Sequence, residues 1–352
     1  MQTIIKKIDA INPNNNIADI SEAASILRNG GLVAFPTETV YGLGANALDP
    51  SAIKKIYEAK GRPSDNPLII HISSMSELLK VACEVLPMAY KLAEAFWPGP
   101  LTMILPKTHT VPCQTTGGLS SVAVRMPANL IAALLIKEAG VPIAAPSANS
   151  SGKPSTTDAS HVEFDLNGKV DMILDGGSAS LGIESTVIDL TVCPPCILRP
   201  GSVTIEMIQK VCPEAIANTH LSLKENEQPK SPGMKYTHYS PRAQVIVISG
   251  IMEDTVAKIN LLTSGYLQKR KKVGIMACDE TVGFYNASGA HIISVGNRER
   301  IETVAENLFK VLRDFDFYGV DVILAEGLSK EGLGTSIMDR LVKASGNTVI
   351  YV

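Results

Sequence analysis

Short runs of β-branched and other apolar residues alternate with amphipathic segments over about the first 210 residues of this 352-residue chain. Such an alternation is typical of a sheet whose strands are connected by helices. The predicted fold class of this part is therefore α/β, with a mixed sheet. The runs that we interpret as strands are residues 30–35, 67–72, 101–105, 121–126, 141–146, 170–175, 184–190 and 196–199.

Three helices have recognisable ends in the sequence. Asp49 followed by Pro50 is typical of a helix start, because the carboxylate can cap the first free N–H groups and proline fits the first turn. That helix is predicted to end near Gly61. Two more are predicted over residues 88–96, stopped by the run WPGP, and over residues 129–139, before a glycine.

A polar, proline-bearing stretch over residues 213–242 interrupts the pattern and is interpreted as an interdomain linker. After it, strand-like runs at 244–249, 272–277, 291–295 and 320–326 alternate with helical segments, notably 300–315. This indicates a second, smaller domain with a parallel sheet. We therefore expect an N-terminal domain over 1–212, a linker over 213–242 and a C-terminal domain over 243–352.

Composition and charge exclude several classes of function. The formal charge is −3 and aromatic residues make up 5% of the chain. Proteins that bind nucleic acid through charge and stacking usually have a basic, aromatic-rich surface, so no stable direct nucleic-acid binding is expected. No apolar run approaches the ~18 residues of a membrane span, and the N-terminus lacks the layout of a signal peptide. A cytoplasmic protein without membrane contact is expected.

The six cysteines are scattered, which favours reduced thiols over a disulfide framework. Only Cys193 and Cys196 have a metal-like spacing. A zinc site needs a second Cys or His pair, and a redox site needs the pair to open a helix, whereas two prolines separate these cysteines between strand-like runs. No protein metal site is predicted.

Polar motifs follow several of the predicted N-terminal strands, where loops of α/β sheets hold ligands. Together, the cations Lys60, Arg62, Arg125 and Arg199 would neutralise a triphosphate and a carboxylate. The alternative for any one of them is an ordinary solvated cation. The motifs are PTETVYGLG at 36–44, KGRP at 60–63, RMP at 125–127, PSAN at 146–149, EST at 184–186 and RPG at 199–201.

Together with the later run PGMKYTHYSP at 232–241, these motifs resemble those of the threonylcarbamoyl-AMP synthase family in its long form. The resemblance covers essentially the whole chain. It implies a YrdC-like N-terminal domain with an open twisted mixed sheet, and a smaller C-terminal Rossmann-like parallel α/β domain. The role of the C-terminal domain rests on analogy of fold alone.

The resemblance also implies roles for individual residues. Lys60 and Arg62 match the catalytic pair at the phosphates, and we expect them to serve the phosphates rather than the fold. The positions that match threonine-binding residues are Thr39, His71, Arg125, Ala145 and Ser185. The positions that match ATP-binding residues are Arg62, Asn66, Ser121, Ser147, Asn149, Ser155, Arg199, Tyr236 and His238. A lone histidine in an apolar strand is more often a core residue, so only the resemblance makes His71 a ligand.

The activity that the resemblance implies is the synthesis of L-threonylcarbamoyladenylate, with release of pyrophosphate, from ATP, L-threonine and bicarbonate. Mg²⁺ is expected with ATP, and the product is expected to pass to a tRNA threonylcarbamoyl transferase. The sequence lacks a GxxxxGK[ST] loop and a Ser-His-Asp or Cys-His set. Catalysis by positioning and charge stabilisation is therefore expected.

Two other functions stay open at this point. The fold would also suit an RNA-binding module, although the net charge and the few aromatic residues argue against it. It would equally suit a carbamoyl transferase, although such proteins carry zinc-finger sequence that is not found in this chain.

The run at 231–242 places Tyr236, His238 and Tyr239 beside Lys235, bracketed by turn formers. Such side chains can stack on a base or donate hydrogen bonds to phosphates. We expect this segment to close over the N-terminal site as a lid. The alternative is that the tyrosines only pack between the domains.

Overall fold

The structure is a computed structural model that describes residues 2–217, 229–231, 238–285 and 289–352. The chain divides into two compact units, each with its own sheet. The first comprises Met1–Ser151, Ser155–Ser180 and Glu184–Lys235, and the second Gly152–Pro154, Leu181–Ile183 and Tyr236–Val352.

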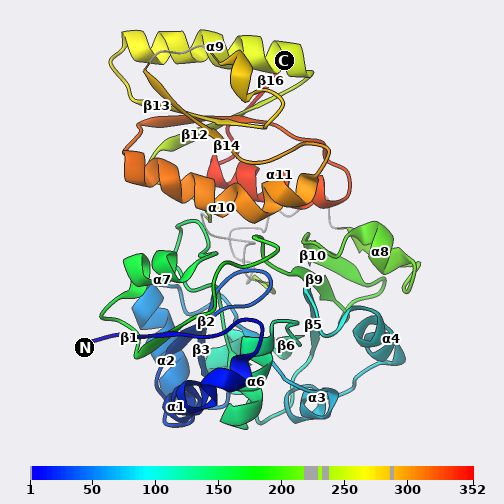
Figure 1. Ribbon diagram of the computed structural model, residues 1–352. Coiled ribbons are helices and arrows are strands. Elements are labelled where there is room, and N and C mark those ends of the chain that lie inside the picture. The colour runs from blue at the N-terminus through cyan, green and yellow to red at the C-terminus, as the bar shows by residue number, and fades with distance from the viewer. Residues whose placement is uncertain (1, 218–228, 232–237, 286–288) are drawn as a thin grey trace. The chain divides into compact units, whose positions relative to one another are not determined.

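The sheet of the first unit is mixed, as predicted, and has eleven strands in the order β1-β8-β2-β3-β7-β4-β6-β5-β9-β10-β11. Figure 1 shows strands of this sheet from β1 on the left to β9 and β10 on the right. The strands are β1 (Ile4–Lys7), β2 (Val33–Phe35), β3 (Gly42–Asn46), β4 (Ile69–His71), β5 (Leu101–Pro106), β6 (Ser121–Arg125), β7 (Ile143–Ala144), β8 (Met172–Asp175), β9 (Thr186–Asp189), β10 (Cys196–Arg199) and β11 (Ile216–Ala217).

Both faces of this sheet are buried under helices. Successive side chains of a strand point to opposite faces, so Ala34 of β2 joins one hydrophobic cluster whereas Val33 and Phe35 join another. The first cluster also contains residues of α2 (Pro50–Lys60), α3 (Met75–Val81), α4 (Pro87–Phe96) and α7 (Ala159–Leu166). The second contains residues of α1 (Ile17–Arg28) and α6 (Leu130–Ala139). Two shorter helices are α5 (Cys113–Thr116) and α8 (Ile205–Gln209).

The three helices with predicted ends lie where the sequence places them. The Asp49 carboxylate accepts a hydrogen bond from the N–H of Ser51, and Gly61 ends α2 in the left-handed conformation with φ of 63°. Asn129 caps α6 in the same way, and Gly140 ends it. α2 therefore delivers Lys60, its last residue, next to a fixed turn.

β3 was not predicted, because its sequence GLGAN begins inside the motif PTETVYGLG, which we interpreted as part of a loop. Glycine is a poor strand former, but here it makes room for a neighbour. A Cβ on Gly44 would lie 2.8 Å from the ring of Phe35 and 3.0 Å from Ile143. The motif PTETVYGLG is therefore a tight connection between the antiparallel strands β2 and β3.

The strand directions bring several chain ends to one edge of the sheet. β4 runs parallel to β6, whereas β5 is antiparallel to β6 and parallel to β9, and β10 is antiparallel to β9. The carboxyl ends of β4, β6 and β10 therefore lie at the same edge as the amino ends of β5 and β9. This edge carries the predicted site residues His71, Arg125, Ser185 and Arg199.

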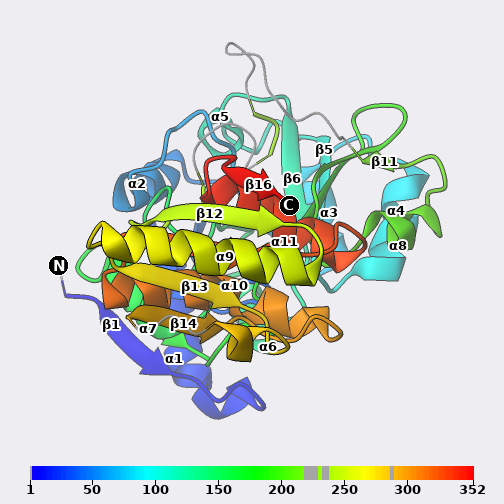
Figure 2. The ribbon, with the colours of Figure 1, turned by 90° about the horizontal axis from the view of Figure 1, so that it is seen from above.

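The sheet of the second unit is entirely parallel, as predicted, with the strand order β14-β13-β15-β12-β16. α9 (Met252–Gln268) covers one face, and α10 (Ile301–Tyr318) and α11 (Leu333–Ala344) cover the other (Figure 1). In Figure 2, which views the protein from above, α9 lies over β12 and β13. The strands are β12 (Gln244–Ser249), β13 (Val273–Ala277), β14 (Ala290–Ser294), β15 (Val322–Glu326) and β16 (Val349–Tyr351).

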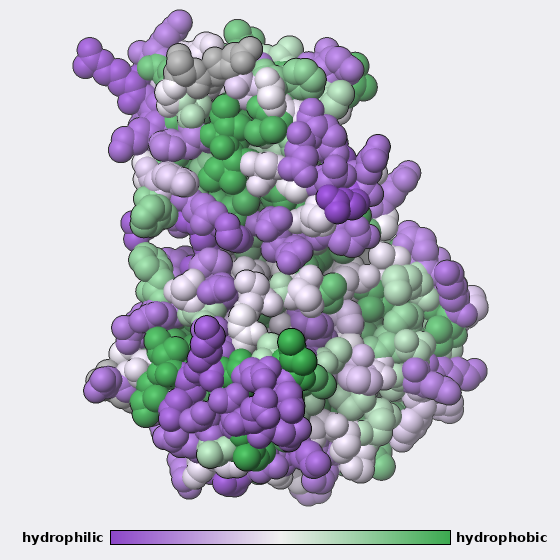
Figure 3. Space-filling model, in the orientation of Figure 1, coloured by the Kyte–Doolittle hydropathy of each residue, from purple (hydrophilic) through white to green (hydrophobic). Residues whose placement is uncertain are grey.

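β14 forms an edge of this second sheet, and its isoleucines are only half-buried. Figure 3 accordingly shows apolar surface on the second unit between α9 and α10. Among the helices of the described residues, none has both the length and the apolar character needed to cross a membrane.

Candidate active site

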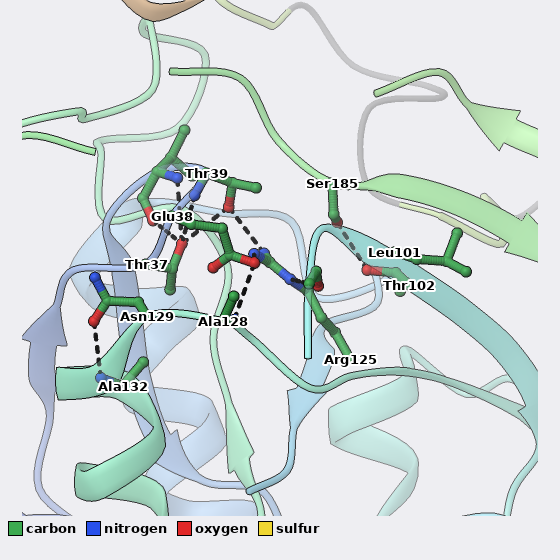
Figure 4. A network of polar contacts seen from close by, with 12 residues as sticks. Thr37, Glu38, Thr39, Leu101, Thr102, Arg125, Ala128, Asn129, Ala132 and Ser185 are labelled. Atoms are coloured by element: carbon green, nitrogen blue, oxygen red, sulfur yellow. Dashed lines mark hydrogen bonds and ion pairs between the residues drawn. The ribbon is translucent and has the colours of Figure 1, made fainter. Parts of the chain in front are cut away.

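Arg125, the last residue of β6, is the centre of a buried polar group in the first unit (Figure 4). Its side chain is only 4% exposed. Nε donates to the carbonyl oxygen of Gly99 at 3.2 Å, and NH1 donates to the hydroxyl of Thr39 at 2.9 Å. NH2 forms an ion pair with Oε1 of Glu38 at 2.7 Å. The guanidinium plane is thereby held by two segments that are distant in sequence, the loop at 38–39 and Gly99.

The loop between β2 and β3 presents Thr39 to this arginine. The hydroxyls of Thr37 and Thr39 lie 2.9 Å apart, and Thr37 also donates to the carbonyl oxygen of Val40 at 2.6 Å. Threonine hydroxyls commonly fix turns in this way. The loop is therefore pinned by its own side chains, which sets the position of Thr39.

His71 ends β4 and lies beside Arg125 in the strand register. Its ring meets that of Phe35 edge to face, with centroids 6.4 Å apart. Burial, and secondly the charge of Arg125, lower the pKa of His71 from its ordinary 6.5 to about 3. The imidazole is therefore neutral at physiological pH, and its Nδ1 has no hydrogen-bond partner within the described part of the chain.

Lys60 is buried and holds the PSAN segment. Its ammonium group donates to the carbonyl oxygens of Ser147 and Asn149, and lies 3.5 Å from the side-chain oxygen of Asn149. The hydroxyl of Ser147 donates to that same side-chain oxygen at 2.5 Å. The structure therefore gives Lys60 a structural contact, while its predicted contact with phosphate stays a prediction.

The PSAN segment also lies against the segment that follows Thr39. The N–H of Ala148 donates to the carbonyl oxygen of Tyr41 at 2.8 Å, and the N–H of Leu43 donates to that of Pro146 at 2.8 Å. Ala145, directly before PSAN, is 5% exposed and donates its N–H to Ile69 of β4. Ala145, Ser147 and Asn149 are thus brought next to the threonine-rich loop.

Arg199 and Ser185 form another joined pair. Nε of Arg199 donates to the carbonyl oxygen of Ser185 at 3.0 Å, and NH2 donates to its hydroxyl at 3.1 Å. The Ser185 hydroxyl also lies 2.8 Å from that of Thr102 in β5. Arg199 therefore fixes the hydroxyl that was predicted to meet threonine.

Arg62 and Asn66 are close together after α2. Nε of Arg62 donates to the carbonyl oxygen of Asn66 at 3.3 Å, and NH2 donates to that of Pro67 at 3.1 Å. The side-chain oxygen of Asn66 is buried and accepts no hydrogen bond from the described residues. An amide in this position is suited to bind a polar ligand group.

Four predicted residues remain, of which three lie in separate places and one is not described. Ser155 is buried and its hydroxyl donates to the Glu184 carboxylate at 2.5 Å, whereas Ser121 opens β6 at the opposite end from Arg125. Tyr236 lies outside the described residues. His238 belongs to the second unit, where its ring lies 5.6 Å from that of Tyr239.

Sequence reasoning assigned no role to three residues of these groups. Glu38 was quoted only as part of PTETVYGLG, Thr102 lies inside an apolar strand, and Glu184 was quoted only as part of EST. A carboxylate between two threonines, directly after a predicted strand, was the signal that could have identified Glu38. Its partner can be recognised only from the tertiary fold.

Comparison with known proteins places this site in a family. A family model described as "Telomere recombination" matches residues 25–201, and one described as "Threonylcarbamoyl-AMP synthase, C-terminal domain" matches residues 203–346. The threonylcarbamoyl-AMP synthase of Pyrococcus abyssi is 52% identical over 94% of this chain and 95% of its own length. The chain belongs to the threonylcarbamoyl-AMP synthase family.

Other members of this family support the same assignment. The Bacillus subtilis threonylcarbamoyl-AMP synthase is 48% identical over 96% of each chain. The crystal structure of Pyrococcus abyssi Sua5 complexed with L-threonine aligns with a TM-score of 0.94 at 50% identity, covering 99% of this chain and 100% of that one. The predicted two-part α/β fold and the predicted family are thereby confirmed.

Proposed function

We propose that this chain is an L-threonylcarbamoyladenylate synthase, an adenylyl-transferring enzyme that uses ATP, L-threonine and bicarbonate. The observation that carries the proposal is the Arg125 group, a buried guanidinium held by Thr39, Glu38 and the backbone of Gly99. Such a rigid fork is suited to bind the carboxylate of an amino acid. The related Pyrococcus abyssi protein was crystallised with L-threonine.

The reaction has two bond-forming steps. First, the ammonium group of threonine loses a proton and its nitrogen adds to the carbon of bicarbonate or CO₂, which yields N-carboxythreonine. Overall, bicarbonate gives water and one proton in this step, whereas CO₂ gives two protons. The new carboxylate oxygen then attacks the α-phosphorus of ATP, and the bond to pyrophosphate breaks. AMP is transferred to the carboxylate, so the finer class that we propose is a nucleotidyltransferase.

The site supports these steps by holding its groups in place. The Thr39 hydroxyl and Arg125 are positioned for the threonine carboxylate, and the Ser185 hydroxyl is fixed by Arg199. Neutral His71 adds an acceptor without adding charge. Positioning of this kind removes much of the entropic barrier to a reaction between two bound substrates.

ATP would be bound by dispersed donors rather than by one glycine-rich loop. Arg62 and Asn66 follow α2, and Lys60 holds the PSAN segment with its hydroxyl and amide groups. Within the described residues, no three His, Cys, Asp or Glu side chains form a group that could hold a metal ion. We therefore propose that Mg²⁺ enters with ATP and is bound by phosphate oxygens and water.

A pyrophosphate-release assay tests this function. The purified protein is incubated with ATP and Mg²⁺, and L-threonine and bicarbonate are omitted in turn. The proposal expects release only when all substrates are present. Release supported by carbamoyl phosphate in place of threonine and bicarbonate would favour the carbamoyl transferase alternative, and release from ATP and bicarbonate alone would contradict the proposal. We also propose that the reactive acyl adenylate passes to a tRNA threonylcarbamoyl transferase, which would use it to modify tRNA.

A further inference from the structure

The buried pair of Glu38 and Arg125 contains two polar atoms without hydrogen-bond partners. Oε2 of Glu38 and NH2 of Arg125 are both covered, and neither makes a hydrogen bond within the part of the chain that the structure describes. The 2.7 Å contact between NH2 and Oε1 brings opposite charges together without hydrogen-bond geometry. Buried polar atoms are rarely left in this state unless water, an ion or a ligand completes them.

The two carboxylate oxygens of Glu38 are used unequally. Oε1 meets Arg125 and also accepts the N–H of Ala128 at 3.2 Å, whereas Oε2 has no donor among the described residues (Figure 4). The side chain is 11% exposed and its backbone carbonyl accepts the hydroxyl of Ser180. Glu38 is therefore held at one oxygen and at its backbone, and its other oxygen can accept a hydrogen bond from a ligand.

The chemistry of the missing donor follows from the two atoms together. Oε2 of Glu38 is a negatively charged hydrogen-bond acceptor, and NH2 of Arg125 is a positively charged donor beside it. An α-amino acid carries the complementary ammonium and carboxylate groups on one carbon. The imidazole of His71 is neutral or positively charged in its two protonation states, so it cannot supply the negative partner. A phosphate would satisfy NH2 of Arg125 but would be repelled by Oε2 of Glu38.

We propose that Glu38 binds the α-ammonium group of the amino-acid substrate through Oε2 and accepts its proton as the carbamate forms. This inference deepens the proposed function, and its second part, the proton transfer, rests on that function. The ammonium nitrogen gives one proton to Oε2, and its freed electron pair forms the N–C bond to bicarbonate. A C–O bond of bicarbonate breaks, and the leaving hydroxide takes a second proton from the nitrogen and departs as water. The proton on Oε2 then leaves to solvent as the one net proton of this step.

The test compares three ligands and two proteins in the absence of ATP and Mg²⁺. L-Threonine carries both charged groups, 2,3-dihydroxybutanoate carries the carboxylate with a hydroxyl in place of the ammonium, and threoninol carries only the ammonium. Affinities are measured by calorimetry for the unchanged protein and for Glu38→Gln. Glu163→Gln, which replaces an exposed carboxylate on α7, is the matched control.

The unchanged protein and the control should bind threonine about 10- to 100-fold more tightly than dihydroxybutanoate, as expected for a buried charge-assisted hydrogen bond. In Glu38→Gln the threonine affinity should fall to that of dihydroxybutanoate, whose own affinity should be unchanged. Threoninol should lose its affinity in the same variant. Because these readouts need no turnover, they separate this inference from the adenylation activity.

Two results would overturn the inference. If Glu38→Gln binds threonine as tightly as the unchanged protein, Oε2 does not meet the ammonium group. If threonine and dihydroxybutanoate lose affinity equally, Glu38 only positions Arg125. Should the unchanged protein bind threonine in this pattern but release no pyrophosphate, the proposed function fails while the assignment of the ammonium site stands.

Discussion

Lys60 and Asn149 are joined through a single ammonium group, which donates to the backbone oxygen of Asn149 and lies 3.5 Å from its side-chain oxygen. Lys60 is 4% exposed and donates to backbone carbonyl oxygens, so it stabilises the fold in addition to any role in binding a ligand. The contact connects the end of α2 to the PSAN segment.

Lys60→Met should therefore lower the stability of the protein as well as its activity. The change leaves buried carbonyl oxygens without their charged donor, at a cost of about 3 kcal/mol. Thermal unfolding should show a fall of roughly 6–12 °C in Tm. Lys54→Met, at a side chain that is 76% exposed on the same helix, is the matched control and should change Tm by less than about 2 °C. An unchanged Tm in Lys60→Met would show that these contacts contribute little.

Arg62→Ala should act mainly on the nucleotide. Arg62 is half-buried and donates hydrogen bonds to the backbone oxygens of Asn66 and Pro67, so its loss should cost less stability than the loss of Lys60. If the guanidinium contacts phosphate in the transition state, kcat/KM for ATP should fall by about 10²-fold. Steady-state kinetics with saturating threonine measures this effect. A kcat/KM for ATP equal to that of the unchanged protein would remove Arg62 from the site.

His71 should make the protein less stable as the pH falls. Its pKa is about 3 in the folded state and 6.5 in the unfolded chain, so the unfolded state binds more protons between these values. Stability is therefore full above pH 6.5 and is lost progressively below it, by about 2 kcal/mol at pH 5. Urea unfolding of the substrate-free protein at several pH values measures the loss. His71→Gln should unfold with a shallower pH dependence, and an identical slope would contradict the buried neutral imidazole.

Threonine should be preferred over serine by a modest factor. The two substrates differ by one methyl group, and an apolar pocket separates such pairs by about 10- to 200-fold. We expect Ala145 and its neighbours near Thr39 to contact that methyl. The ratio of kcat/KM values for the two amino acids is the measurement. Equal use of serine would show that the pocket is assigned to the wrong residues.

The sequence allowed prediction of those parts of the fold that depend on local chemistry. Asp49 and Asn129 mark helix starts because each side chain caps its own first turn. The central strands could also be predicted, because both faces of the sheet are buried and these strands are therefore runs of apolar residues. β3 could not be predicted, because its glycines are poor strand formers. Gly44 is needed there because the ring of Phe35 leaves no room for a side chain, and this contact is visible only in the tertiary structure.

The candidate site was predicted by its residue types but not by its pairings. Arg125 and Arg199 were expected to be cations of one site, yet the partners that orient them, Glu38 and Ser185, lie 87 and 14 positions away in the chain. No local pattern encodes such a pair. Half of the lid predicted for 231–242, residues 232–237, falls outside the described residues, so the lid stays a prediction. Tyr239 packs on Phe309 of α10 with ring centroids 5.1 Å apart.

The most direct test of the central claim is to identify the product itself. The protein is incubated with ATP, Mg²⁺, L-threonine and ¹³C-bicarbonate, and the mixture is analysed by mass spectrometry and by ¹³C and ³¹P NMR. The account predicts a labelled threonylcarbamoyl-AMP whose carbonyl carbon is coupled to phosphorus through the bridging oxygen, together with an equal amount of pyrophosphate. Unlabelled AMP as the only adenylate, or ADP with phosphate, would contradict it.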